Sequence, residues 1–121
     1  MRYLVATDSV HTTAAACDHL KPRLAGDDTV VVTVSESRDG ADALNVAWAR
    51  LVGAGAVEMN RLDPAEGVID VVLAAASDEG TDELVVGPHA GDPEAGPSLG
   101  TTARRIIEGA DLPVVAVPLS P

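Results

Sequence analysis

Aromatic and basic side chains are the scarcest classes in this chain. It has no phenylalanine, one tryptophan (Trp48) and one tyrosine (Tyr3), so it lacks the aromatic platform on which single-stranded bases stack. Its 8 lysines and arginines are outnumbered by 19 aspartates and glutamates, which leaves a formal charge of −11. Because such a surface repels a phosphate backbone, we expect no binding of nucleic acid.

The chain also has only one cysteine and no long apolar segment. The one cysteine, Cys17, excludes an internal disulfide and a cysteine-based metal cage, and we interpret it as a small buried side chain on a helix. No apolar run approaches the ~18 residues of a membrane span. The chain enters a strand-like segment directly after Met1, without the layout of a signal peptide. We therefore expect a soluble, cytoplasmic protein without a membrane contact.

The acidic excess is typical of proteins adapted to brine. High negative charge keeps a protein soluble where salt screens self-repulsion, with a Debye length of ~3 Å at 1 M. We predict a halophilic host, an archaeon or a bacterium that accumulates salt. The acidic pairs Asp27-Asp28, Asp78-Glu79 and Asp82-Glu83 are then interpreted as solvated surface rather than as metal sites.

Strand-like and helix-like segments alternate along the chain without a linker, which predicts a single domain over residues 1–121. The run Thr29 to Val34 is typical of a strand buried on both faces. Thr12 or Thr13 can cap the first helix, and Pro22 is expected to distort or end its last turn. The second helix carries Leu44, Trp48, Leu51 and Val52 at helical spacing. The predicted strands are 2–7, 29–34, 57–62, 83–86 and 113–117, and the predicted helices are 12–24, 41–52, 63–78 and 99–109.

This alternation predicts an α/β fold, a doubly wound parallel sheet with helices on both faces. In such sheets a ligand binds beyond the carboxyl ends of the strands, where the strand order reverses. The candidate positions therefore follow the strands directly: Thr7-Asp8-Ser9, Ser35-Glu36-Ser37, Asp63, and Gly87 onward.

Three common site motifs are excluded. The turn after the first strand has no glycine, which rules out a dinucleotide fingerprint. The segment Gly91 to Gly96 has the spacing of a P-loop, but Pro97 and Ser98 follow in place of the phosphate-binding lysine. A serine hydrolase is excluded because the chain has no Gly-x-Ser-x-Gly elbow and its histidines, His11, His19 and His89, lie on or beside loops and helix starts.

The stretch from Val85 to Thr102 suits a phosphate chain. Gly87 ends a buried strand, a long loop rich in glycine and proline follows, and Gly100-Thr101-Thr102 opens a helix. The unpaired N–H groups and the positive dipole of a helix start attract anions, and threonine hydroxyls add donors. Alternatively the glycines only form a flexible loop and Thr101 only caps the helix.

The chain resembles the universal stress protein family over nearly its whole length. The segment 3–8 is similar to the first strand of that family with its terminal aspartate, 85–87 to its fourth strand, and 110–117 to its final helix-to-strand junction. Nucleotide-binding members carry Gly, two residues, Gly, nine residues, Gly, then Ser or Thr. Gly87, Gly100 and Thr101 match these offsets, whereas Ala90 stands at the second glycine with Gly91 beside it.

The resemblance implies an adenine nucleotide alpha hydrolase-like, Rossmann-like fold with strand order 3-2-1-4-5. It also implies ATP or another adenine nucleotide, with or without Mg²⁺, and a homodimer through Val114, Val115, Ala116 and Val117. Asp8 would meet the ribose or adenine side of the nucleotide, and Val34 would pack against the base. Alternatively Asp8 caps a helix or belongs to a turn, Val34 is a core residue and His89 is a solvent-facing loop residue. The implied nucleotide-binding residues are Ala6, Thr7, Asp8, Val34, Val86, Gly87, His89, Ala90, Gly100, Thr101 and Thr102.

Two functions remain open at this point. The first is a universal stress protein that binds ATP as a regulatory ligand, with at most slow hydrolysis and no catalytic residue. The alternative is a nucleotide-free stress protein that acts as a dimeric interaction module with a protein partner that the sequence does not specify. Ala90 and the prolines Pro88, Pro93 and Pro97 favour the alternative. A nucleotide hydrolase is the weakest interpretation, because no phosphate-directed lysine and no carboxylate cluster is present.

Overall fold

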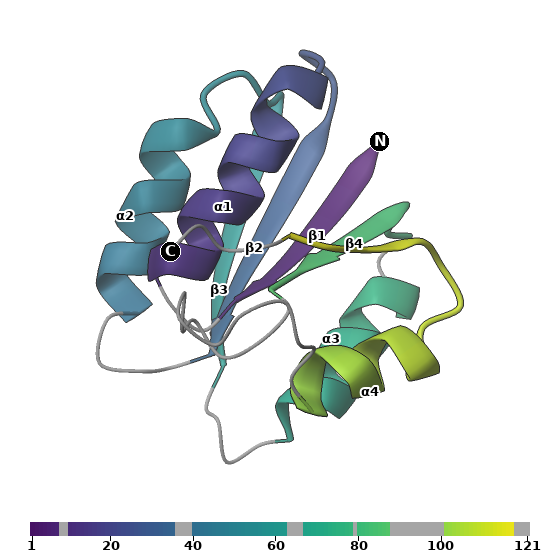
Figure 1. Ribbon diagram of the computed structural model, residues 1–121. Coiled ribbons are helices and arrows are strands. Elements are labelled where there is room, and N and C mark those ends of the chain that lie inside the picture. The colour runs from purple at the N-terminus through teal and green to yellow at the C-terminus, as the bar shows by residue number, and fades with distance from the viewer. Residues whose placement is uncertain (8–9, 36–39, 63–66, 79, 88–100, 118–121) are drawn as a thin grey trace.

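A computed structural model describes residues 1–7, 10–35, 40–62, 67–78, 80–87 and 101–117 (Figure 1). Five strands form one sheet in the order β3-β2-β1-β4-β5, and all four neighbouring pairs are parallel. The predicted α/β class and strand order are therefore confirmed. The strands are β1 (Arg2–Thr7), β2 (Thr29–Ser35), β3 (Ala56–Leu62), β4 (Glu83–Val86) and β5 (Val114–Ala116), and the helices are α1 (Val10–Leu20), the 3₁₀ turn η1 (Lys21–Arg23), α2 (Gly40–Arg50), α3 (Val68–Asp78) and α4 (Thr101–Gly109).

The sheet separates the core into two layers, because successive side chains of a strand point to opposite faces. Tyr3 and Val5 of β1 pack with α1 and α2, whereas Leu4 packs with α3 and α4. Figure 1 shows these two pairs of helices on opposite sides of the sheet. The central strands are thus covered on both faces, as their unbroken apolar runs predict.

The first helix begins and ends earlier than the sequence predicts. α1 runs from Val10 to Leu20, and Pro22 lies in the following 3₁₀ turn, so the prediction that the helix ends at this proline is confirmed to within two residues. The capping prediction for Thr12 and Thr13 is wrong. Both threonines lie inside α1 and are buried, at 3% and 0% exposed.

The helix α2 presents a different face to the core than its largest apolar residues suggest. Of the four residues at helical spacing, Leu51 is buried and Leu44 is half-buried, but Trp48 and Val52 are 65% and 80% exposed. The small residues Ala43 and Ala47 fill the core positions instead. Alanine at these positions allows the helix to lie close to the sheet.

Asp28 forms hydrogen bonds with several segments at the end of the sheet where the strands begin. This residue is only 5% exposed, so the interpretation of Asp27-Asp28 as solvated surface is wrong for Asp28 and right for the exposed Asp27. Its carboxylate accepts hydrogen bonds from the Met1 amino group at 2.8 Å and from the Ala25 N–H at 2.9 Å. Its carbonyl accepts from the Gly55 N–H at 2.8 Å. One residue therefore links the chain start with the turns before β2 and β3.

The second acidic pair at this edge is also not simply solvated. The Asp82 carboxylate is exposed, yet it accepts a hydrogen bond from the Arg2 backbone N–H at 2.8 Å, and Glu83 is half-buried. The remaining pair includes Glu79, which lies outside the described residues. Within the described ranges, none of the helices is long and apolar enough to cross a membrane.

Candidate functional site

The carboxyl ends of β1, β2 and β4 bring the described candidate residues together. In the strand register Ala6 is opposite Val86, and Thr7 is opposite Val34. Gly87 follows Val86 directly, so it lies at the same edge. The strand order reverses between β1 and β4, which is where ligands bind in such sheets, so Ala6, Thr7, Val86 and Gly87 lie at that point. Val34 lies beside Thr7 at the end of the next strand, β2.

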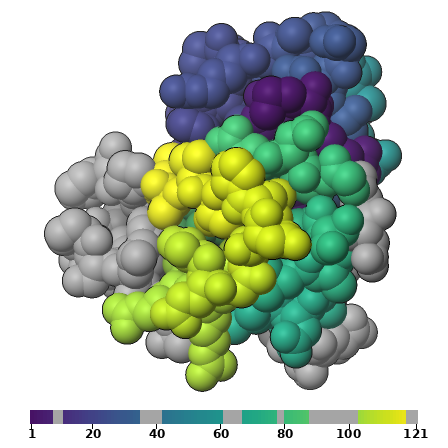
Figure 2. Space-filling view, turned by 90° about the vertical axis from the view of Figure 1, so that its right-hand side faces the viewer, coloured from purple at the N-terminus to yellow at the C-terminus, as the bar shows by residue number. Residues whose placement is uncertain are grey.

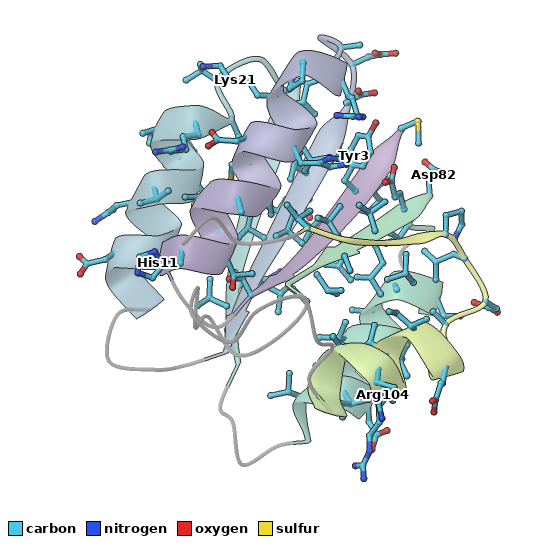
Figure 3. All side chains as sticks on the ribbon, viewed as in Figure 1. Tyr3, His11, Lys21, Asp82 and Arg104 are labelled. Carbon is cyan, nitrogen blue, oxygen red and sulfur yellow. The ribbon has the colours of Figure 1, made fainter. Side chains whose placement is uncertain are left out.

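The first turns of α1 and α4 belong to the same edge. A helix that connects parallel strands runs back across the sheet, so its amino terminus lies near the carboxyl ends of the strands. In Figure 3, His11 and Lys21 lie at opposite ends of α1, and Lys21 is on the side where the strands begin. Thr101 and Thr102 occupy the corresponding first turn of α4. The predicted residues Asp8, His89, Ala90 and Gly100 lie outside the described residues.

Burial distinguishes the residues of this edge. Val34 is 0% exposed and packs in the core cluster under α1 and α2, and Val86 is 2% exposed in the opposite cluster. Thr7 is 6% exposed, and Ala6 and Gly87 are half-buried. A contact of Val34 with a nucleotide base stays a prediction, while its core role is observed.

A pair of threonine hydroxyls joins β1 to α1 beneath the site. Thr13 Oγ1 donates a hydrogen bond to Thr7 Oγ1 at 3.0 Å, and both side chains are buried. The sequence analysis missed Thr13 and Thr12 as residues of this region. Their signal is present, because Thr13, Ala16, Cys17 and Leu20 follow the i, i+3, i+4, i+7 pattern of a buried stripe once the helix begins at Val10.

Nucleophilic and metal chemistry find no support among the described residues. They contain no group of three His, Cys, Asp or Glu side chains that could hold a metal ion. Burial raises the pKa of the Cys17 thiol to about 11, so the reactive thiolate is not formed near neutral pH. What the described part of this site does offer is buried hydroxyls, a glycine and the start of a helix.

Comparison with known proteins places the fold. No protein-family model and no curated protein matches the chain. Solved structures do match it over almost the whole chain, and they include universal stress proteins. The hypothetical protein MJ0577, whose biochemical function was assigned from its structure, aligns with a TM-score of 0.76 and 18% identity over 97% of this chain and 94% of its own.

Two further structural neighbours carry the family name. A universal stress protein in complex with cAMP aligns with a TM-score of 0.71 and 19% identity over 99% of this chain and 98% of its own. The universal stress protein from Archaeoglobus fulgidus aligns with a TM-score of 0.61 and 22% identity, covering 97% of this chain and 98% of its own. The chain thus has the fold of universal stress proteins along almost its entire length.

Proposed function

We propose that this protein is a universal stress protein that binds an adenine nucleotide, ATP first of all, as a regulatory ligand. The observation that carries the proposal is the meeting of Ala6, Thr7, Val34, Val86 and Gly87 at the carboxyl edge of the sheet. The motif that begins at Gly87 and reaches Thr101 supports it, as does a structural neighbour that was solved with cAMP.

The proposed binding uses backbone donors in place of a lysine. The first-turn N–H groups of α4, at Thr101 and Thr102, have no partner within their own helix and carry the positive end of its dipole. Each hydrogen bond to a phosphate oxygen contributes about 1.5–3 kcal/mol, so a few of them hold a nucleotide without a basic side chain. Asp8 would then contact the ribose or adenine, as the family resemblance implies.

The direct test is to identify what the purified protein carries. Protein prepared in molar KCl is extracted with acid, the extract is separated on a column that resolves adenine nucleotides, and the stripped protein is titrated with ATP, AMP and cAMP by calorimetry. We expect stoichiometric binding that Asp8→Ala and Gly100→Val weaken. Asp111→Ala is the matched control, because it removes one exposed carboxylate at the start of β5, on the opposite edge.

An empty extract together with no heat of binding would refute nucleotide binding. The nucleotide-free interaction module, with Ala90 closing the site, would then be the better proposal. With bound ATP we expect hydrolysis to be slow at most, because the described residues include neither a metal cluster nor a reactive thiol. Fast release of phosphate that Asp8→Ala abolishes would contradict a purely regulatory role.

We further propose a homodimer through β5. Among the described residues β5 pairs with β4 alone, and its three residues are half-buried although they end the sheet. Figure 2 shows the yellow segment around β5 on the surface beside α4. An apolar edge strand of this kind invites pairing with a second chain.

A further inference from the structure

The end of β4 lies directly against the first turns of α1. A Cβ built on Gly87 would be 2.7 Å from Thr12 Cγ2, 3.0 Å from Thr12 Oγ1 and 3.4 Å from Thr12 Cβ. Such Cβ distances under 3.0 Å are essentially never observed, so a side chain at position 87 would force one of the two segments to move. Thr12 is 3% exposed, which means that it has little free space into which to shift.

Rotation of the Thr12 side chain can lengthen the closest approach only from 2.7 to 3.0 Å, so the contact stays tight. A threonine in any staggered rotamer fills two of its three γ positions, and both of the positions now filled are within 3.0 Å of the Cβ site. At least one of them therefore stays filled. The β-branched side chain is also restricted within a helix, so a change of rotamer has its own cost.

Neither backbone segment is free to yield. α1 is held to β1 by the hydrogen bond between Thr13 and Thr7 and by Cys17 and Leu20, which are both fully buried. The end of β4 is held by its pairing with β1 on one side and β5 on the other, including the hydrogen bond from the Val117 N–H to the Val86 carbonyl at 2.9 Å.

The requirement for glycine at position 87 comes from space, not from backbone conformation. The described glycines with a positive φ are Gly67 and Gly80, and Gly87 is not one of them. Gly109 also has a close neighbour, Leu73 Cδ1 at 2.8 Å, but that atom is the end of a flexible side chain. A Cβ on Gly53 would meet nothing within 4 Å. The tight contact at Gly87 is therefore of a different kind from these two.

We propose that Thr12 is a positioning residue of the nucleotide site, a role that rests on the proposed function. Its side chain fills the volume beside Gly87 and so fixes the backbone where the chain leaves β4 and begins the glycine-rich motif. Glycine at this position is required by the contact with α1, and the nucleotide depends on it only through the placement of the backbone.

Compensating substitutions test this role. We expect Gly87→Ala to lower the melting temperature by about 5–10 °C and to weaken ATP binding about tenfold, because it overpacks a rigid contact. Thr12→Ala removes both γ atoms and so makes room for a methyl group at position 87. We therefore expect Gly87→Ala to lower the melting temperature and the ATP affinity much less in the Thr12→Ala background than in the parent protein. Thr12→Val keeps both γ positions filled and should give no recovery. If the Gly87→Ala protein does not fold, we expect the double variant of Thr12→Ala and Gly87→Ala to fold, which would show the same coupling.

Two results would overturn the proposal. One is a Gly87→Ala defect in stability that Thr12→Ala leaves unchanged, which would mean that the two residues are not coupled. The other is recovery of stability without recovery of ATP affinity, which would mean that the nucleotide itself needs the glycine. Gly109→Ala is the control, since it adds the same methyl group at the far end of α4 and should leave ATP affinity unchanged. If the parent protein binds no nucleotide, the proposed function fails, whereas the thermal measurements still decide whether Thr12 fixes Gly87.

Discussion

The amino group of Met1 lies 2.8 Å from the carboxylate of Asp28, and the two form an ion pair at the edge of the sheet opposite the candidate site. Formation of this ion pair shifts the pKa of both groups. The hydrogen bond from Met1 and that from the Ala25 N–H lower the pKa of Asp28 below its ordinary value of 3.8. The hydrogen bond to Asp28 raises the pKa of the Met1 amino group above 8.0.

The ion pair predicts loss of stability at both extremes of pH. A carboxylate with a lowered pKa stabilises the fold above pH 3.8, and this contribution disappears as the pH falls through its folded value. An amine with a raised pKa stabilises the fold below pH 8.0, and its contribution disappears as the pH rises through its folded value. Urea midpoints measured from well below pH 3.8 to well above pH 8.0 should show both losses, and Asp28→Asn should remove them.

The control for this experiment is Asp27→Asn, which changes the neighbouring, exposed carboxylate in the same way. The protein must begin at Met1 with a free amine, because acetylation removes the charge that Asp28 pairs with. An acetylated protein with the pH profile of the free one would show that the amino group contributes nothing.

Trp48 should report on the surface of α2 and not on the core. It is the one tryptophan of the chain and is 65% exposed, so we expect red-shifted emission that acrylamide quenches readily in the native state. Unfolding should change this emission little, and N-acetyltryptophanamide provides the fully exposed reference. Blue-shifted emission that acrylamide does not quench would contradict the exposure of Trp48 in the free protein.

The thiol of Cys17 should react only when the fold opens. It is 0% exposed, and burial raises its pKa to about 11, so both access and thiolate formation are suppressed. Labelling with a maleimide should be slow in native protein and rapid in urea, and the native rate should follow the unfolding equilibrium. Rapid native labelling, at the rate of a free thiol, would exclude this burial.

Salt should strengthen the proposed nucleotide binding. A protein with a formal charge of −11 repels ATP in dilute buffer, whereas molar salt screens charges beyond ~3 Å and leaves the local N–H donors in effect. We therefore expect calorimetric affinity for ATP to rise as KCl is raised from dilute to molar concentration. Adenosine, which has no charge, is the control ligand and should respond much less. ATP affinity that stays constant or increases at low ionic strength would contradict this prediction.

The proposed dimer predicts a specific role for the backbone of Ala116. The Leu84 N–H bonds to the Pro113 carbonyl and the Val117 N–H to the Val86 carbonyl, so in the alternating ladder the N–H of Ala116 points to the open edge of β5. Light scattering in molar salt should give twice the chain mass. Ala116→Pro removes this outward donor and should shift the equilibrium to monomer while circular dichroism stays unchanged. A parent protein of single-chain mass would refute the dimer.

The fold was predictable because its signals are local and repeated. The run Thr29 to Val34 and the segment Glu83 to Val86 are mostly apolar and lack a regular polar alternation, which indicates strands covered on both faces, and the structure confirms both strands. Strand order came from the family resemblance, since crossovers between distant segments leave no mark in a short window of sequence. The predicted start of the first helix at Thr12 was wrong because a capping threonine and a buried threonine look alike in sequence.

Residues whose role depends on distant partners escaped the sequence analysis. Trp48 and Val52 are larger and apolar, yet they are exposed, and the small residues Ala43 and Ala47 are the ones that face the core. The buried Asp28 pairs with the amino group of Met1, which is 27 residues away in the sequence. The contact between Thr12 and Gly87 joins positions that only the folded sheet brings together. At the candidate site, the sequence identified the strand-end residues but not the threonines beneath them.

The hydrogen bonds around Asp28 lie far from the candidate ligand residues, and this separation affects how the sequence of such a protein can diverge. Contacts that anchor the chain start and two turns lie at one edge of the sheet, while the candidate ligand residues lie at the other. Substitutions among the ligand-facing residues therefore leave these anchors intact, apart from those that touch the pair of Thr12 and Gly87. A protein built in this way can change its ligand over evolutionary time while it keeps its fold, and we expect homologous chains to vary most at the carboxyl edge.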